Sequence, residues 1–429
     1  MPEVTFVALH ALPAIDPTVP GVFGGTETRA WTFARALARL PGWKVNLAVR
    51  PRSPHSCYEG VRIQRVRKPL YDIFLHVGQC LAARQEFPFV TIKRWSWHLF
   101  WELPVCVASR PFLSRRGRSL GGVGQFSQLP GDLIVTFGVH VDSAKAIAGA
   151  HATGRPAVLM LGADSDLDER YATDPNYVSP YGNRSTDCLR ALREADQIVV
   201  QTEQQQDLLL AHFHREGTFI ANPIDEVVWD QQAEWPLPEE LKDLENSGYV
   251  LWVGRADRFH KRALHCVELA EQLPDIPFVM LMNPRDPDVT REVHARRPPN
   301  LRIVEQVSFE QMSTLFRHAR VYVNTSALGW EGFPNTFLQA AASRTPICSL
   351  EFGAEFLKEF DCGACAEGDF SRLVQVVQDC WLSPKSTMHV DASRRRVLAE
   401  FGAENQCQKL ATVFDNALVQ FTGGSLPEP

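Results

Sequence analysis

One stretch of the sequence decides the fold: Trp330-Glu331-Gly332-Phe333-Pro334-Asn335-Thr336-Phe337-Leu338-Gln339. Gly332 tolerates a positive φ and Pro334 fixes φ ahead of a helical run, so we expect a helix to begin near Asn335. The unpaired N–H groups of a helix N-terminus suit a diphosphate. Glu331 and Gln339 are separated by roughly 12 Å if the segment is helical, so they would contact different parts of one extended ligand.

Two further motifs precede this stretch. Val250-Leu251-Trp252-Val253-Gly254-Arg255 has the pattern of a buried strand that ends in a glycine and a cation, and Lys261 follows beyond a polar turn. Arginine offers a planar fork to two phosphate oxygens, and lysine offers a compact charge. The alternative is a solvated basic turn, because Arg258 and Arg262 stand beside them. Near the N-terminus, Gly24-Gly25 follows the first predicted strand and lets the backbone approach a ligand.

Short apolar runs alternate with helical patterns along both halves of the chain, which predicts two parallel, doubly wound sheets. A chain of 429 residues also exceeds what one hydrophobic core usually supports, so two domains are expected. The strands of the first domain are predicted at 4–9, 44–49, 132–137, 156–161 and 197–202. The strands of the second domain are predicted at 249–253, 277–282, 301–305, 321–324 and 346–350.

Together these motifs resemble those of the retaining glycosyltransferases of family 4 (glycosyl transferases group 1), which carry a Glu-x7-Glu signature. Gln339 stands where that family has the second Glu. The resemblance implies an α/β protein of the GT-B fold, with two Rossmann-like domains that face a central cleft. Residues 1–225 would form the acceptor domain, completed by a C-terminal helix at 392–420. Residues 226–247 would be a linker, and residues 248–391 the nucleotide-sugar donor domain.

The resemblance also implies a role for each motif residue. Glu331 would contact the transferred sugar, while Arg255 and Lys261 would bind the donor diphosphate. Gln339 would hold the ribose. The rest of the donor site would consist of the glycine turns and the helix start, namely Gly24, Gly25, Gly254, Gly332, Phe333, Asn335 and Thr336.

The acceptor side is less defined. His140 follows the predicted strand at 132–137, about where the family has an active-site histidine, although a lone histidine is also often structural. Asp164 and Asp166 follow the next strand and would suit acceptor hydroxyls, but an Asx-turn explains them equally well. The family commonly has a histidine where Gly162 falls in this chain.

Composition narrows the class of partner. A net charge of −6 and a pI near 6.1 argue against nucleic acid, which needs a basic surface. No apolar run reaches the ~18 residues of a membrane span, and the Met1 end shows no leader, so we expect a cytoplasmic protein, at most peripheral at the inner face of the membrane. The sequence offers no metal-ligand cluster. Because Arg255, Lys261 and the helix start can neutralise a diphosphate, we expect no metal cofactor.

Segment 92–118 mixes aromatic and cationic residues. It contains Ile92-Lys93-Arg94-Trp95-Ser96-Trp97-His98-Leu99-Phe100-Trp101, followed by Arg110, Arg115, Arg116 and Arg118. Such a mixture suits a membrane interface. The alternative is a helix that packs its aromatic rings into the core and exposes ordinary arginines.

The sequence therefore predicts a retaining, metal-independent hexosyltransferase. It would move a sugar from a UDP- or GDP-sugar to a glycan or lipid-linked acceptor, in polysaccharide or glycoconjugate biosynthesis. Two alternatives stay open: a sugar-nucleotide epimerase of the same fold, and a nucleotide-sugar binding protein without turnover. The second alternative is supported only by Gln339.

Overall fold

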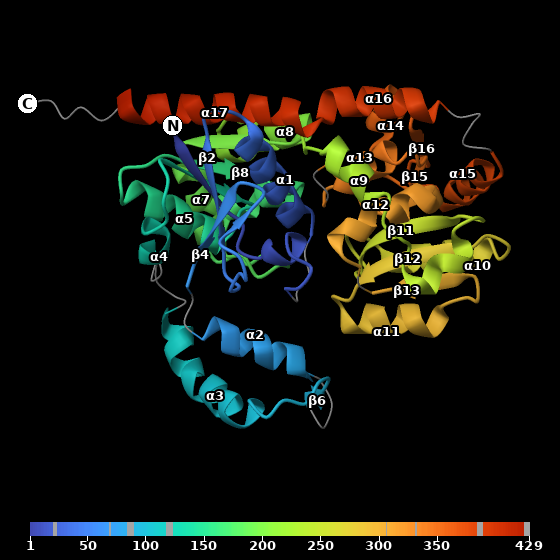
Figure 1. Ribbon diagram of the computed structural model, residues 1–429, viewed down its shortest axis with the longest axis horizontal. Helices are drawn as coiled ribbons and strands as arrows, with labels where there is room; N and C mark the ends of the chain where they lie inside the picture. Colours follow the sequence, from blue (N-terminus) through green and yellow to red (C-terminus); the bar gives the residue numbers. More distant parts are fainter. Residues whose placement is uncertain are drawn as a thin grey trace, which may run out of the picture.

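Two parallel sheets, one from each half of the chain, form the body of the molecule (Figure 1). The computed structural model describes residues 1–19, 24–67, 70–83, 90–116, 123–305, 307–330, 333–383 and 389–423. Helices cover both faces of each sheet, as continuous apolar strands require. The predicted α/β architecture, with two doubly wound units, is confirmed.

The first sheet is parallel except at one edge, where β3 runs antiparallel to β4. In spatial order its strands are β10 (Thr218–Phe219), β9 (Gln197–Val200), β8 (Ala157–Met160), β7 (Leu133–Phe137), β1 (Glu3–Val7), β2 (Lys44–Val49), β4 (Val61–Arg65) and β3 (Cys57–Tyr58). The five predicted strands of this half are confirmed. The edge strands β3 and β10, and β4 beside β3, escaped prediction because they are short or half-exposed and lack a continuous apolar run.

Separate hydrophobic layers cover the two faces of this sheet. One layer is formed by α1 (Gly25–Arg39) and α17 (Ala403–Gly423). The opposite layer contains η2 (Asp164–Leu167), α4 (Val123–Ser127), α5 (Val141–His151), α6 (Arg170–Thr173), α7 (Ser185–Glu194) and α8 (Glu203–Phe213). The short η1 (Leu12–Ala14) follows β1. The C-terminal helix thus belongs to the core of the N-terminal unit.

The second sheet is parallel throughout. In spatial order its strands are β13 (Leu301–Val304), β12 (Phe278–Asn283), β11 (Tyr249–Arg255), β14 (Ala319–Asn324), β15 (Ile347–Ser349) and β16 (Gly363–Cys365). One face packs on α10 (Ala263–Gln272), α11 (Pro287–Arg296) and α15 (Phe370–Leu382). The other face packs on α9 (Glu226–Gln232), η3 (Glu239–Leu244), α12 (Phe309–His318), α13 (Asn335–Ala342), α14 (Ala354–Phe360) and α16 (Val390–Phe401). All five strands predicted in this half are present.

Two segments differ from the sequence-based expectation. The predicted single helix at 392–420 is two helices, α16 and α17. The helix is interrupted at Gly402, where the backbone leaves the helical conformation. There it pairs with Ile224, whose N–H donates to Phe401 O at 2.9 Å. A Cβ at Gly402 would lie 2.6 Å from Leu398 O, which explains the glycine. The segment 226–247, expected to be a linker, is largely helical and buries Trp229 against the second sheet.

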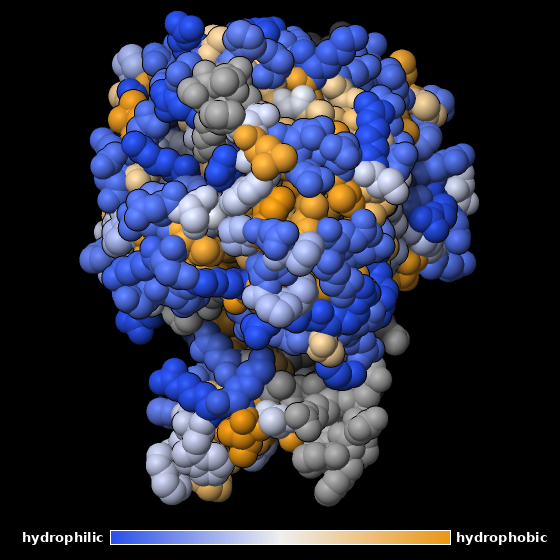
Figure 2. Space-filling model, turned by 90° about the vertical axis from the view of Figure 1, so that its right-hand side faces the viewer, coloured by the Kyte–Doolittle hydropathy of each residue, from blue (hydrophilic) through white to orange (hydrophobic). Residues whose placement is uncertain are grey.

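A small lobe projects from the N-terminal unit, away from the body (Figures 1 and 2). We define the lobe as residues 70–83 and 90–116. It contains α2 (Tyr71–Cys80), the antiparallel strands β5 (Leu81–Ala83) and β6 (Val90–Ile92), and α3 (Leu99–Arg116). The two helices are joined by a hydrogen-bonded pair, His76 Nδ1 and Glu102 Oε2, at 2.5 Å, with Glu102 buried.

Candidate functional site

The predicted diphosphate-binding helix begins where the sequence indicated. α13 starts at Asn335, with Pro334 at its N-cap and no side chain hydrogen-bonded to the cap. The hydroxyl oxygen of Thr336 accepts a 2.8 Å hydrogen bond from the Tyr322 O–H, which leaves the Thr336 O–H and backbone N–H as possible donors to a ligand. Glu331 and Gly332, the predicted sugar contact and elbow, lie outside the described residues.

The glycine pair of the first half meets this helix directly. Asn335 Nδ2 donates to Gly25 O at 3.1 Å, and a Cβ on Gly25 would lie 3.3 Å from that nitrogen. Gly24 caps α1, and its N–H donates to Glu27 Oε2 at 2.9 Å. The structure therefore brings Gly24 and Gly25 to the N-terminus of α13, across the boundary between the two units.

The two predicted phosphate ligands share one turn after β11. Asp257 organises this turn, because its Oδ1 accepts the backbone N–H groups of His260 at 3.0 Å and Lys261 at 2.6 Å. Arg255 Nη2 donates to His260 Nδ1 at 2.6 Å. Burial and the neighbouring cations hold the pKa of His260 well below its usual value, so the ring is a neutral acceptor. Asp257 and His260 were missed from the sequence, although an Asp just after the strand-end Arg signals such a turn.

Lys261 lies beside the β14 loop. Its Nζ donates to Ser326 Oγ at 3.3 Å. Burial and the charge of Arg255 lower the pKa of Lys261 to about 7, while Asp257 acts in the opposite direction. Gly254 makes room for this arrangement, because a Cβ there would lie 2.6 Å from the Trp252 ring and 3.2 Å from Lys261 Cβ. The structural role of Gly254 is thus to let β11, Trp252 and Lys261 pack closely.

The neighbouring arginines differ from these two cations. Arg262 donates to Thr325 O at 2.7 Å and to Glu351 Oε1 at 2.6 Å, which ties the turn to the β14 loop. Arg258 pairs with Glu292 at the surface. Arg262 therefore has a structural role in the turn, whereas Arg258 is a surface residue.

A tyrosine from the N-terminal unit contacts two arginines at this site, Arg255 and Arg285. Tyr181 sits at the tip of a tight turn in which Gly182 N–H donates to Ser179 O at 2.8 Å. The guanidinium carbon of Arg255 lies 5.7 Å from its ring centroid, and that of Arg285 lies 5.4 Å away. This is cation–π distance. Sequence reasoning missed Tyr181 because its chain neighbours carry no motif.

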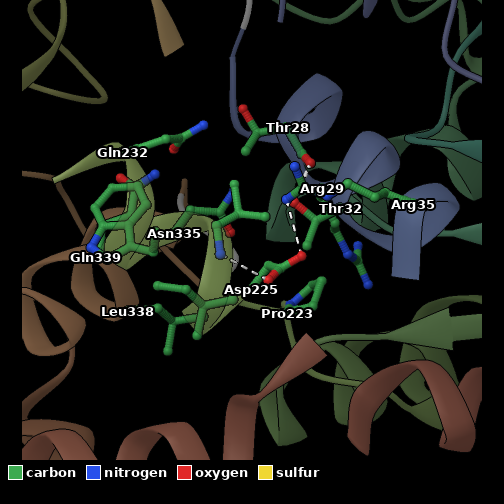
Figure 3. Close-up of a pocket in the computed structure, with 13 residues that line it drawn as sticks. Thr28, Arg29, Thr32, Arg35, Pro223, Asp225, Gln232, Asn335, Leu338 and Gln339 are labelled. Carbon is green, nitrogen blue, oxygen red and sulfur yellow. Dashed lines mark hydrogen bonds and ion pairs between the residues drawn. The ribbon is translucent and has the colours of Figure 1, made fainter. Parts of the chain in front are cut away.

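Gln339 faces a different part of the boundary between the units. It is buried and lines a small cavity of ≈ 30 Å³ with α1 and α9 residues. Figure 3 shows Gln339 and Asn335 opposite Thr28, Thr32 and Arg35. No hydrogen bond or ion pair within the described residues joins Gln339 to Arg255 or Lys261. The ribose role of Gln339 stays a prediction.

Phe333 has a structural environment. Its ring stacks on Phe401 with centroids 5.5 Å apart and meets Phe356 at 5.0 Å. Its carbonyl accepts a 2.7 Å hydrogen bond from Asn222 Nδ2. The side chain of Phe333 is therefore turned away from a polar ligand, and the segment before α13 is fixed to the other unit through Asn222.

The acceptor-side candidates gather at the carboxyl ends of β7 and β8. His140 caps α5, and its Nδ1 accepts the Ser143 N–H at 3.2 Å. Nε2 then carries the proton of the neutral ring. Asp166 Oδ2 accepts the Gly162 N–H at 2.7 Å, and burial raises the pKa of Asp166 despite this bond. His140 Nε2 and Asp166 Oδ2 both lie 3.9 Å from the point where a Cβ on Gly138 would stand.

Two neighbours complete this acceptor-side cluster. Asp164 has its pKa raised to about 6 by burial, and its Oδ1 accepts from Gln205 Nε2 at 3.2 Å. His10, which follows β1, has its pKa lowered by burial and by Arg50. His10 was missed from the sequence, although it follows the first predicted strand in the way that His140 follows a later one. The cluster can hold or move protons near a hydroxyl-bearing acceptor.

The described residues contain no group of three or more His, Cys, Asp or Glu side chains placed to hold a metal ion. Within the same residues, none of the helices is long and apolar enough to cross a bilayer.

Comparison with known proteins supports the fold and the general activity. Residues 247–381, which carry the second sheet, match the family model described as glycosyl transferases group 1. No curated protein matches the chain. The family match supports a glycosyltransferase in general terms.

Solved structures are similar over nearly the whole chain. Sucrose-phosphate synthase from Thermosynechococcus elongatus is 18% identical, with 98% of this chain and 100% of that chain covered and a TM-score of 0.62. The Anabaena protein HepE, solved with UDP and glucose, is 14% identical, with coverage of 97% and 100% and a TM-score of 0.61. Trehalose-6-phosphate synthase OtsA is 11% identical, with coverage of 96% and 99% and a TM-score of 0.67. These likenesses confirm the predicted GT-B fold.

Proposed function

We propose that the protein is a retaining glycosyltransferase that uses a UDP- or GDP-sugar and builds a polysaccharide or glycoconjugate. The observation that carries this proposal is that Arg255 and Lys261 share one turn at the end of β11, while the α13 N-terminus meets Gly25 across the two units. Arg255 and Lys261 supply the positive charge that a diphosphate needs. The HepE structure, solved with UDP and glucose, lends support from a protein of the same fold.

In the proposed reaction, the bond between the anomeric carbon and the diphosphate oxygen breaks. The acceptor hydroxyl oxygen bonds to that carbon, and its proton passes to the departing diphosphate. Arg255 and Lys261 stabilise the negative charge that develops on the leaving group, as preorganised donors do in other transfer reactions. Glu331 would face the sugar as positive charge develops on it. His140 would orient a hydroxyl on the acceptor side through its Nε2–H.

The same arrangement motivates metal independence. Two side-chain cations and the unpaired N–H groups of a helix N-terminus can balance a diphosphate without a bound ion. Donor turnover should therefore persist in excess EDTA. Loss of turnover with EDTA, restored by Mg²⁺ or Mn²⁺, would contradict this part of the proposal.

The central residue can be tested directly. Glu331→Gln should reduce the turnover number at least about a hundredfold with little change in donor affinity, because the carboxylate acts as charge develops. Steady-state kinetics with candidate UDP- and GDP-sugars measures this, with Glu355→Gln on the surface of α14 as a matched control. Wild-type activity in Glu331→Gln would refute the mechanism. Isomerised sugar nucleotide would instead identify an epimerase, and donor binding without hydrolysis or transfer would identify a pure binder.

The lobe supports a lipid-linked acceptor. The alternative that its aromatic rings pack into the core is wrong for Trp97, which is 74% exposed, and for Phe100, which is 65% exposed. Trp95 contacts both of these rings at centroid distances of 6.0 and 5.8 Å. Arg94 beside them is also exposed. Side chains from Arg110 onward in segment 92–118 lie outside the described part of the chain. Exposed aromatic rings flanked by cations suit an anionic bilayer surface.

We therefore propose peripheral membrane contact through the lobe. Replacing Trp97 and Trp101 with Ser should abolish sedimentation with anionic liposomes and leave the melting temperature nearly unchanged. Trp235→Ser, which alters an exposed tryptophan outside the lobe, is the matched control. Undiminished sedimentation of the double variant, or equal loss in the control, would exclude this surface.

A further inference from the structure

The loops that follow β11 and β12 are joined beside the turn that carries Arg255. The two strands are parallel neighbours, and Arg255 stands opposite Asn283 in their register (Figure 1). The Ala256 N–H donates to Asn283 O at 2.9 Å, and the Asp286 N–H donates to Ala256 O at 3.1 Å. Arg285 lies between these two bonded positions of the second loop. It therefore stands at the same edge of the sheet as Arg255, where parallel sheets bind their ligands.

The charge at this edge is not balanced. Burial lowers the pKa of His260, and so do three nearby cations, namely Lys261, Arg255 and Arg285. One carboxylate, Asp257, opposes them, and its Oδ2 lies 3.7 Å from Arg255 Nε. Arg285 itself is exposed and has no ion pair within the described part of the chain. Three cations that share one carboxylate favour the binding of an anion.

The ring of Tyr181 brings two of these cations together. Its centroid lies 5.4 Å from the guanidinium carbon of Arg285 and 5.7 Å from that of Arg255. Two rings of the C-terminal unit hold Tyr181 in turn, Phe259 at 6.4 Å and Trp330 at 6.3 Å between centroids. Attraction to one aromatic face offsets the repulsion between the two arginines. Two planar hydrogen-bonding groups are thus held side by side before a ligand arrives.

We propose that Arg285 is a third cation of the donor diphosphate site, and that Tyr181 is a positioning residue that holds Arg285 and Arg255 for the phosphate oxygens. The inference rests on the proposed function, because it takes a nucleoside diphosphate as the ligand. Tyr181 comes from the N-terminal unit, so this part of the site is complete only when the two units are placed as in this structure. A diphosphate bound to both arginines therefore favours that placement.

Calorimetric titration of the full chain with UDP, GDP, uridine and guanosine tests the role of Arg285. Arg285→Ala should weaken the diphosphate that the wild type binds more tightly by about tenfold and leave its nucleoside unchanged, because a charge-assisted bond to phosphate is lost. Arg291→Ala is the matched control. Arg291 is an exposed arginine of α11 that pairs with Asp288 at 3.1 Å, so its loss removes the same charge and should change neither affinity.

The role of Tyr181 is tested with two variants and a double-mutant cycle. Tyr181→Ala should weaken the diphosphate at least about threefold, whereas Tyr181→Phe keeps the aromatic face and should bind as the wild type does. Combining Tyr181→Ala with Arg285→Ala should weaken binding by less than the product of the two single effects, because the ring acts partly through Arg285. A residue that only supports the fold would show no such coupling. Melting curves verify that each variant is folded.

The opposite results overturn the inference. Unchanged diphosphate affinity in Arg285→Ala, or an equal loss in Arg291→Ala, would make Arg285 an ordinary surface residue. Equal weakening of diphosphate and nucleoside would exclude a phosphate contact. A loss in Tyr181→Phe as large as in Tyr181→Ala, or fully independent effects in the cycle, would refute the positioning role.

Lys261→Ala separates failure of this inference from failure of the proposed function. If Lys261→Ala weakens the diphosphate and Arg285→Ala does not, the donor site stands and Arg285 lies outside it. If the wild-type protein binds neither UDP nor GDP, the proposed function and this inference are both wrong.

Discussion

The buried cations of the two units have different kinds of hydrogen-bond partner. In the N-terminal unit, Arg29 is buried and donates to Leu161 O at 2.6 Å and to Ile220 O at 3.4 Å. In the C-terminal unit, Arg255 is half-buried and donates to the ring of His260, and Lys261 donates to a serine hydroxyl. Burial lowers the pKa of a cation in each unit, to about 9 for Arg29 and to about 7 for Lys261.

The difference lies in what each cation is bonded to. Backbone carbonyls at strand ends cannot move without breaking the sheet, so Arg29 is a fixed structural element. A serine hydroxyl and an imidazole are side chains that can rotate, so Arg255 and Lys261 can exchange these partners for phosphate oxygens. The sequence alone does not distinguish a structural cation from a binding one. The hydrogen-bond partners in the folded protein do.

The largest effect is expected on protein stability, when the structural cation Arg29 is replaced. Arg29→Met should destabilise the protein by about 2–5 kcal/mol, because it leaves the carbonyls of Leu161 and Ile220 without that donor in the interior. Thermal unfolding followed by circular dichroism measures this. Arg258→Met is the control, since Arg258 pairs with Glu292 at the surface and should cost less than about 1 kcal/mol. Equal effects of the two substitutions would remove the distinction drawn for Arg29.

Lys261→Ala tests the binding side. It should weaken UDP binding by about 1.5–3 kcal/mol and leave uridine binding unchanged, because the lost partner is a charge-assisted bond to phosphate. The melting temperature should not fall as it does for Arg29→Met, since Lys261 carries a desolvation cost in the empty protein. Calorimetric titration of both ligands decides it. Equal weakening of UDP and uridine would refute the phosphate role.

The depressed pKa of Lys261 predicts a pH dependence. Above a pKa of about 7 the empty protein holds a neutral amine, so donor binding must take up a proton, and affinity falls as pH rises. The dissociation constant of UDP-glucose should rise by up to about tenfold per pH unit above that value, or ~1.4 kcal/mol. Titrations between about pH 6 and 8.5 keep the donor's own charge constant. Lys261→Arg should flatten the profile, because arginine stays charged; a flat wild-type profile would contradict the argument.

The sequence was sufficient for elements that repeat a simple pattern. Continuous apolar runs predicted the strands that carry the site, and Pro334 predicted the start of α13, because burial and fixed φ act locally. It was insufficient where distant segments meet. Tyr181 reaches Arg255 only through folding of the two units, and Gly402 breaks the last helix only because Ile224 pairs with it there. The exposure of Trp97 likewise depends on the lobe standing apart from the body.

The smallest effect is expected at Gln339, whose surroundings are neither purely structural nor purely ionic. An amide and a carboxylate both accept hydrogen bonds from ribose hydroxyls, so the family's glutamate should be tolerated here. The cavity also contains Asp225, which would repel a new carboxylate, and Arg35, which would attract it, so the net electrostatic change is small. Gln339→Glu should therefore keep turnover within about tenfold, or ~1.4 kcal/mol of barrier.

Gln339→Ala should instead raise KM for the donor with little change in kcat, because the ribose is held equally before and during transfer. Steady-state kinetics on both variants separates these cases: a fall in kcat for Gln339→Ala with unchanged KM would mean that Gln339 acts on the reacting centre and does not hold the ribose.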